Sequence, residues 1–200
     1  MKSRISLTAL ALLCLTQLAT AQGNMVYNGG FDTDASGWLT NNIGRDGGFY
    51  SGKGDPGGYF LLDNVPSPSL YPTISQVINN LIPGGKYTIS GSYAYSLGLG
   101  DALSTNTSFG VAIDGAFLFE AVAQQGSSWQ NFSFIYTATA PSVTLGLSSQ
   151  INNTQVSYLV DNIAMYAIPE PSAWSLIFLG SGVLICVRRN RKGKKCNVGN

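Results

Sequence analysis

The chain has 200 residues, a formal charge of +1 and no histidine. This length allows about one domain besides any targeting segments. The lack of histidine excludes a Ser-His-Asp triad, and the three cysteines (Cys14, Cys186 and Cys196) all lie outside residues 22–168, which excludes a thiol nucleophile there.

The charges are distributed unevenly. Residues 22–168 carry three basic and nine acidic side chains, a formal charge of −6, whereas the other eight basic side chains lie in the two end segments. Nucleic-acid-binding domains present a basic patch or stripe, which an acidic segment does not provide. We therefore expect no nucleic-acid partner.

Residues 1–21 have the pattern of a secretory signal peptide. Two basic residues precede an apolar run at 7–18, and Ala19 and Ala21 have the small-x-small spacing of a cleavage site. The alternative is a short buried helix. We expect cleavage after Ala21 and an exported domain that folds outside the cytoplasm without a disulfide bond.

Residues 22–168 are predicted to form one all-β domain. Side chains alternate between apolar and polar at 86–96, 109–113, 132–136, 143–147 and 156–166, and no stretch has a convincing helical period. The dipeptide Asp114-Gly115 suits a tight hairpin turn, because both of its residues must accept a positive φ. Many short strands at regular spacing indicate a β-sandwich or a barrel.

Residues 41–72 differ from the rest of this domain. They contain seven glycines and four prolines, and only 59–63 resembles a strand. Glycine and proline clusters of this kind mark turns and loops. We interpret 41–72 as a long loop region.

Residues 169–195 have the pattern of a membrane segment with a basic end. The run 172–187 has 16 residues without a charge, and six Lys or Arg residues follow within 188–195. A spanning helix needs about 17 to 25 apolar residues, so this one is short. The basic end is expected to stay cytoplasmic. The alternative, an amphipathic helix, needs a polar face that the run lacks.

Pro169, Glu170 and Pro171, the apolar run and the basic tail follow one another in the order of a PEP-CTERM sorting signal of Gram-negative bacteria, which this segment resembles. The resemblance implies an exosortase as partner, a membrane-bound cysteine transpeptidase-like enzyme that cuts near the Pro-Glu-Pro motif. It also implies transient residence in the inner membrane, then the cell surface or the extracellular space, in association with exopolysaccharide.

Asn28-Gly29-Gly30-Phe31-Asp32, followed by Gly37-Trp38, resembles the opening of carbohydrate-binding modules with the galactose-binding-like jelly roll. Val160-Asp161-Asn162-Ile163 is similar to their closing strand. The resemblance spans nearly all of 22–168 in short pieces. It implies a jelly-roll β-sandwich and a structural calcium ion where the first and last strands meet, with Asp32 and Asp161 among its ligands.

The residues around Asp161 favour the same ion. Calcium takes six to eight oxygen ligands, and a carboxylate on a strand face with Leu159, Ile163 and Met165 is costly unless it is paired or metal-bound. The alternatives are exposure at an end of the sandwich or an ion pair with Lys86 or Arg45. Asp32 has an alternative too, because Asp before Thr33 suits a turn.

Sugar binding would require exposed aromatic faces flanked by hydrogen-bonding groups. The candidates are Trp38, Tyr59 and Trp129, with Tyr50 and Tyr71 beside them. Tyr93 and Tyr95 share an alternating face with Ile89 and are expected in the core instead.

The sequence predicts an exported, non-catalytic surface or matrix protein. The first alternative is a glycan-binding module. The second is a glycoside hydrolase, which would need two carboxylates at its site. Glu120 is the only glutamate in 22–168, and we expect it on a solvated strand face.

Overall fold

The computed structural model describes residues 23–63, 71–97, 107–122, 128–151 and 156–169. Contacts group residues 22–168 into one compact unit. Within the described residues there are ten strands and no helix, and so no helix that is long and apolar enough to cross a membrane. The predicted signal peptide with Ala19 and Ala21, the motif residues Glu170 and Pro171, and the run 172–187 lie outside the described residues.

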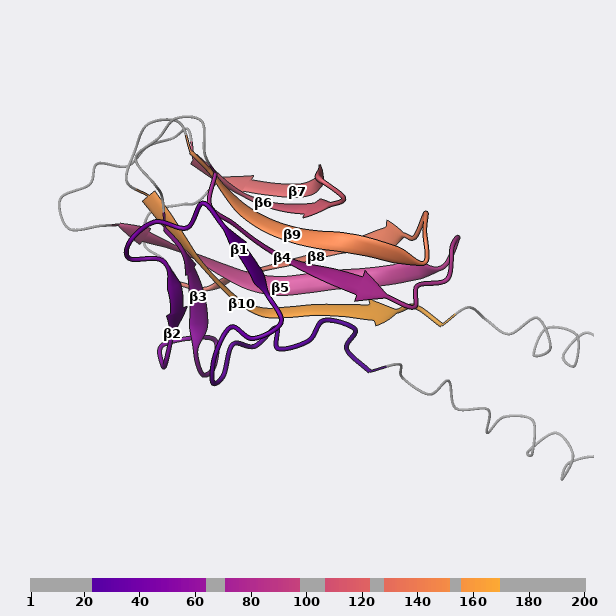
Figure 1. The fold of residues 1–200 in the computed structure, drawn as a ribbon, viewed down its shortest axis with the longest axis horizontal. Coiled ribbons are helices and arrows are strands. Elements are labelled where there is room, and N and C mark those ends of the chain that lie inside the picture. The colour runs from indigo at the N-terminus through magenta and orange to yellow at the C-terminus, as the bar shows by residue number, and fades with distance from the viewer. Residues whose placement is uncertain (1–22, 64–70, 98–106, 123–127, 152–155, 170–200) are drawn as a thin grey trace, which may run out of the picture. The chain divides into compact units, whose positions relative to one another are not determined.

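The strands follow one another along the chain with short connections in the described part (Figure 1). They are β1 (Leu39–Asn41), β2 (Gly48–Tyr50), β3 (Tyr59–Leu62), β4 (Thr73–Asn79), β5 (Lys86–Leu97), β6 (Thr107–Ile113), β7 (Ala116–Val122), β8 (Gln130–Thr137), β9 (Ser142–Ile151) and β10 (Val156–Ala167).

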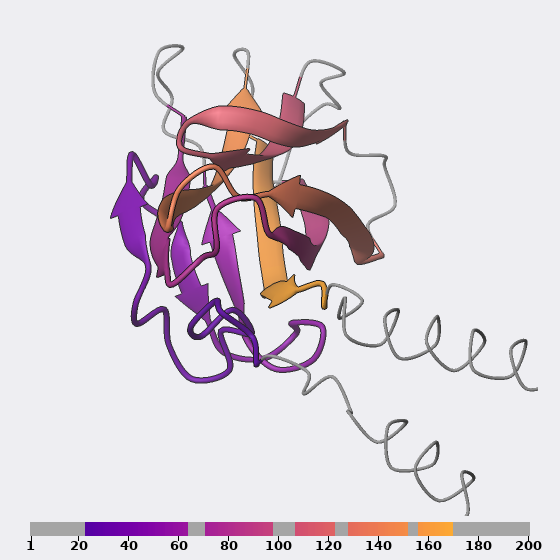
Figure 2. The ribbon, with the colours of Figure 1, turned by 90° about the vertical axis from the view of Figure 1, so that its right-hand side faces the viewer.

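Two five-stranded sheets form a sandwich, which the end-on view shows clearly (Figure 2). The first sheet has the order β1-β4-β9-β6-β7 and the second has the order β2-β3-β10-β5-β8. All neighbouring strands are antiparallel. The prediction of an all-β sandwich is confirmed.

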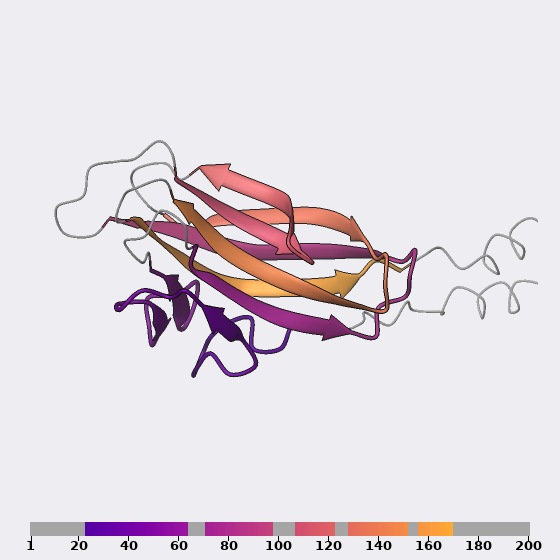
Figure 3. The same cartoon turned by 45° about the horizontal axis from the view of Figure 1, so that its top comes forward.

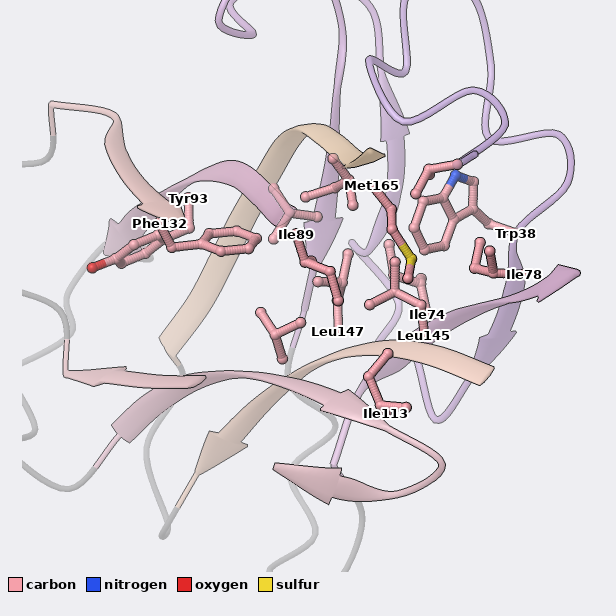
Figure 4. Close-up of a cluster of buried hydrophobic side chains, with 14 of the residues drawn as sticks. Trp38, Ile74, Ile78, Ile89, Tyr93, Ile113, Phe132, Leu145, Leu147 and Met165 are labelled. Atoms are coloured by element: carbon pink, nitrogen blue, oxygen red, sulfur yellow. The ribbon is translucent and has the colours of Figure 1, made fainter. Parts of the chain in front are cut away.

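The core lies between the two sheets and follows the predicted alternation. Tyr87, Ile89, Tyr93 and Tyr95 of β5 are all buried in the core cluster. Figure 4 shows Ile89 and Tyr93 among apolar side chains of the other long strands. The predicted hairpin is also present, because Asp114 and Gly115 between β6 and β7 have φ values of 49° and 82°. Burial of one face in each sheet explains why the two-residue period was visible in the sequence.

Residues 41–72 contain more structure than predicted. Besides β3, which lies within the expected 59–63, the end of β1 and all of β2 fall in this region. β1 and β2 have three residues each, and their side chains are exposed or half-exposed, so these two strands lack an alternating pattern. Figure 3 shows these short strands beside one end of the long strands.

A β-bulge in β10 corrects the face predicted for Asp161. The register with β5 shifts between Asp161 and Ala164, and Asn162 has a φ of 53°. Tyr158 and Val160 point inward before the bulge, so Asp161 and Leu159 point outward. Asp161 therefore does not share a face with Ile163 and Met165, which return to the core after the extra residue.

The opening segment packs directly against this bulge. The amide of Ile163 donates a hydrogen bond of 2.9 Å to the carbonyl oxygen of Gly29. A Cβ atom at Gly29 would lie 1.9 Å from the carbonyl oxygen of Ile163, so only glycine allows this approach. The Asn-Gly-Gly opening and the Asp-Asn strand thus meet in the fold.

Candidate functional site

A row of four residues crosses the outer face of the second sheet. Asp161 of β10 is paired with Ser92 of β5, and Ser92 is paired with Asn131 of β8. The register of β3 with β10 places Tyr59 next to Asp161 on the other side. Side chains in one row across a sheet are direct neighbours.

The loop between β2 and β3 folds over the middle of this row. The amide of Asp55 donates to Asp161 Oδ2 at 2.6 Å, and Ser92 Oγ lies 2.9 Å from Asp55 Oδ2. The side-chain amide of Asn162 donates to the carbonyl oxygen of Asp55. As a result, Asp161 is 0% exposed although it points away from the core.

Three aromatic side chains gather beside the loop. The rings of Tyr50 and Tyr59 stack with their centroids 5.3 Å apart and 6° between their planes. Trp129 meets Tyr59 edge-on at 6.3 Å. Tyr50 is 39% exposed, and Tyr59 and Trp129 are partly exposed. We call these three residues the aromatic cluster.

The cluster and the polar row are adjacent. Trp129 lies directly before β8 and contacts Tyr59, and Asn131 is the second residue of β8. Tyr59 belongs to the row and to the cluster. Partial burial raises the pKa of the Tyr59 phenol, with a further contribution from Tyr50. Of the polar residues near the cluster, Asn131 is exposed and Asp55 is partly exposed, whereas Ser92 and Asp161 are buried.

Trp38 does not meet the condition set for a sugar-binding aromatic. It is only 7% exposed, and its indole Nε1 donates to the carbonyl oxygen of Asn28 at 3.1 Å. Its ring lies 5.5 Å from that of Phe31 and among the core side chains (Figure 4). Tyr71 is exposed but precedes β4 in the other sheet, so it is not part of the aromatic cluster.

Asp161 is held among other acidic groups. Burial raises its pKa to about 6, and the charges of Asp32 and Asp55 act in the same direction. The amides of Asp55 and Asn162 donate to its carboxylate and partly offset this effect. The groups that act on Asp161 in the described residues include no basic side chain, so the ion pair considered for it is not formed there.

Oxygen atoms collect where the opening segment, the β2–β3 loop and the bulge meet. A Cβ atom at Gly57 would lie 2.4 Å from Asp32 Oδ1, and one at Gly30 would lie 3.4 Å from Asp32 Oδ2 and 4.0 Å from Asn162 Oδ1. Oxygen donors suit calcium. Among the described residues no three acidic, histidine or cysteine side chains are arranged to hold a metal, so backbone carbonyls would have to complete the ligand set.

The sequence alone identifies only some of the residues that meet here. Tyr59, Trp129, Asp32 and Asp161 were candidates from the sequence, and the structure places them around one region of the second sheet. The roles of Asp55, Ser92 and Asn131 were missed. The outward positions of Ser92 and Asn131 follow from the alternation, but their meeting depends on strand register.

No protein-family model and no curated protein sequence matches the chain. Solved structures do resemble it. The carbohydrate-binding module TmCBM61, solved with β-1,4-galactotriose, has a TM-score of 0.57 and 13% identity, over 74% of this chain and 100% of that chain. The CBM22 tandem domain of Paenibacillus barcinonensis Xyn10C has a TM-score of 0.53 and 17% identity, over 78% and 48% of the two chains.

An enzyme also shares part of the fold. The arabinose-bound α-L-arabinofuranosidase MgGH51 has a TM-score of 0.54 and 10% identity, over 74% of this chain and 27% of that chain. At these identities the likeness concerns the fold. Residues 22–168 thus have a β-sandwich fold that resembles carbohydrate-binding modules.

Proposed function

We propose that this chain is an exported carbohydrate-binding protein that holds a glycan on the outer face of its second sheet. The observation that carries the proposal is the aromatic cluster beside a polar row. The similarity to carbohydrate-binding modules supports it. The gathering of three rings at one place on the sheet favours binding over a purely structural role.

The chemistry of the surface suits a sugar chain. The apolar C–H face of a sugar ring packs on an aromatic ring, and the hydroxyl groups at its rim bond to nearby polar side chains. Tyr50, Tyr59 and Trp129 offer the rings, and Asn131 and Asp55, both hydrogen-bonded to Ser92, offer polar groups on the same sheet.

Replacement of Trp129 tests the proposal. We expect the full chain, kept in mild detergent, to bind at least one polysaccharide of a glycan array, and Trp129→Ala to weaken that binding about tenfold or more, as loss of a central aromatic contact does. Tyr166→Ala is the matched control, because Tyr166 is 44% exposed on the same sheet outside the cluster. Wild-type binding to no glycan, or equal binding by Trp129→Ala, contradicts the proposal.

We further propose that the chain reaches the outside through its two end segments. The signal-peptide pattern and the Pro169-Glu170-Pro171 pattern support cleavage after Ala21 and exosortase processing near the motif. Mass spectrometry of the extracellular protein should show a start at Gln22 and no basic tail. A product that still ends at Asn200 contradicts the sorting proposal, and alanines at the motif should retain the protein in the inner membrane.

We also propose a structural rather than catalytic role for the acidic groups. Asp161 and Asp32 would bind a calcium ion that joins the opening segment to β10, supported by the oxygen donors around them. Glycoside hydrolysis remains the competing activity. Release of reducing ends from the glycans that bind to the array would establish the hydrolase instead.

A further inference from the structure

The edge strands of the two sheets differ in length and in protection. The edges β1 and β2 have three residues each, whereas the edges β7 and β8 have seven and eight. A long edge invites pairing with another strand unless a charge, a proline or a bulge disrupts it. β7 carries Glu120, and its register with β6 shifts after Val111. β8 contains no charged residue and no proline, and its register with β5 runs without a shift.

The direction of the backbone groups of β8 follows from its neighbours. Ala138, directly after β8, donates its amide to the carbonyl oxygen of Gly85 at 2.9 Å, on the β5 side. The next carbonyl of β5, that of Lys86, accepts instead from Ile168 at 2.8 Å, on the β10 side. Because this direction alternates along antiparallel strands, every second residue of β8 turns its amide and carbonyl away from β5. These residues are Asn131, Ser133, Ile135 and Thr137.

The core is only partly covered along this edge. Phe134 lies in the middle of β8 and is half-buried, and its ring is 6.3 Å from that of Phe119 of β7, with 2° between their planes. The edges of the two sheets therefore lie side by side here. Leu118 and Val122 of β7 and Ile135 of β8 are 46%, 58% and 65% exposed. Exposed apolar side chains beside an unprotected strand edge are typical of a surface that a partner covers.

A second copy of β8 matches this edge. Antiparallel pairing about a two-fold axis at Phe134 places Ser133 opposite the second copy's Ile135 and Asn131 opposite the second copy's Thr137. All four residues that turn away from β5 then exchange hydrogen bonds with their counterparts. The two Phe134 side chains meet at the axis. No charges meet along the strands, although residues 22–168 carry a formal charge of −6.

We propose that the chain forms a two-fold homodimer through antiparallel pairing of β8 with β8 of a second copy. β5 is the only strand that pairs with β8 in the described residues, so the other side of β8 has no strand partner there. The second sheets of the two copies would join into one sheet of ten strands. Because the two-fold axis is perpendicular to this sheet, both aromatic clusters would lie on the same side of it.

Amide hydrogen exchange of the full chain, with detergent micelles in excess over protein, tests the contact. At low protein concentration the amides of Ser133 and Ile135 should exchange quickly, because they face solvent, whereas those of Phe132 and Phe134 face β5 and should be protected. At high protein concentration the Ser133 and Ile135 amides should become protected too. Sedimentation equilibrium in density-matched detergent measures the dimer itself.

Two substitutions should weaken the dimer without unfolding the monomer. Ser133→Pro removes an amide that faces solvent in the monomer, and proline is tolerated at such a position on an edge strand. It removes that donor from both strands of the dimer, so dimerisation should weaken about tenfold or more. Ile135→Lys places a charge on the edge and should act in the same direction. Tyr166→Lys is the control, because Tyr166 lies in the same row of the outer face, with Thr88 between it and Ile135.

The outcomes decide the proposal independently of glycan binding. A chain that stays monomeric at all concentrations overturns it. A dimer that persists in both variants, with their folds verified by circular dichroism, forms through another surface and also overturns it. Equal weakening by Tyr166→Lys contradicts a contact at β8. Glycan binding by a monomeric Ser133→Pro variant would leave the proposed function intact.

Discussion

The outer faces of the two sheets differ, although each sheet has five strands. On the first sheet, β4 and β9 present small polar or aliphatic side chains such as Val77, Asn79 and Thr144. On the second sheet, β3, β10, β5 and β8 carry the aromatic cluster and the polar row. The exposed large apolar side chains of the first sheet, such as Leu39, Phe117 and Leu118, lie on its edge strands β1 and β7.

The difference originates in the segment between β1 and β4. It adds β2 and β3 to the edge of the second sheet, and the loop between these two strands covers part of the outer face at Asp55. The first sheet receives no such cover in the described residues. The long connection therefore distinguishes the two faces, because it brings Tyr50, Asp55 and Tyr59 to the second sheet only.

The largest expected effect is a difference in stability between the Trp38→Ala and Trp129→Ala variants. Trp38→Ala should lower the free energy of unfolding by about 3 to 5 kcal/mol, because it empties a volume in the core. Trp129→Ala removes a partly exposed ring and should cost much less. Urea denaturation of both variants measures this. A larger loss for Trp129→Ala would show that the aromatic cluster is structural.

Asp161 should make the stability of the folded protein depend on pH. Its pKa is raised to about 6 in the folded protein, above about 3.9 in an unfolded chain. Between these values the folded protein binds more protons, so stability falls as the pH rises from 4 to 6. The loss is at most about 3 kcal/mol.

Unfolding in chelator at pH 4.5 and 7 measures this dependence. The free energy of unfolding is compared between the two pH values for the wild type and for Asp161→Ala. The difference between the two proteins in this change is the contribution of Asp161, because the other carboxyl groups are common to both. A difference between the two proteins that stays constant with pH contradicts the assignment.

Bound calcium should offset the loss of stability that ionisation of Asp161 causes. An extracellular site of this type binds with a Kd of about 10⁻⁴ to 10⁻³ M, and a hundredfold excess of calcium adds about 2.7 kcal/mol of stability. Thermal melting of the wild type with calcium and with chelator should show a higher melting temperature with calcium. Asp161→Ala should not respond. A wild-type melting temperature that ignores calcium means that no such ion binds.

The sequence predicts the strands whose side chains alternate between apolar and polar. β5, β6, β8, β9 and β10 each have one buried face, so their two-residue period was visible. β2 has three residues and no buried face, and a pattern of that length is indistinguishable from a loop. The bulge at Asn162 was not predictable either, because it depends on contact with the opening segment rather than on the local sequence.

The sequence identifies single candidate residues of the site, but not which of them lie together. Tyr59 and Trp129 were candidates as single aromatics. Tyr59 lies in β3 and Trp129 directly before β8, with β10 and β5 between these two strands, so their contact depends on the order of strands far apart in sequence. For Trp38 the sequence did not distinguish a buried indole from an exposed one, since either suits a position just before a strand.

The indole N–H signals of Trp38 and Trp129 report the two environments directly. In a ¹H–¹⁵N spectrum of the full chain in detergent micelles, titrated with the best glycan of the array, the Trp129 indole signal and the amides of β8 and β3 should shift. The Trp38 indole, hydrogen-bonded to Asn28, and the amides of β4 and β9 should stay unchanged. Shifts concentrated on β4 and β9, with the Trp129 signal constant, would contradict glycan binding on the second sheet.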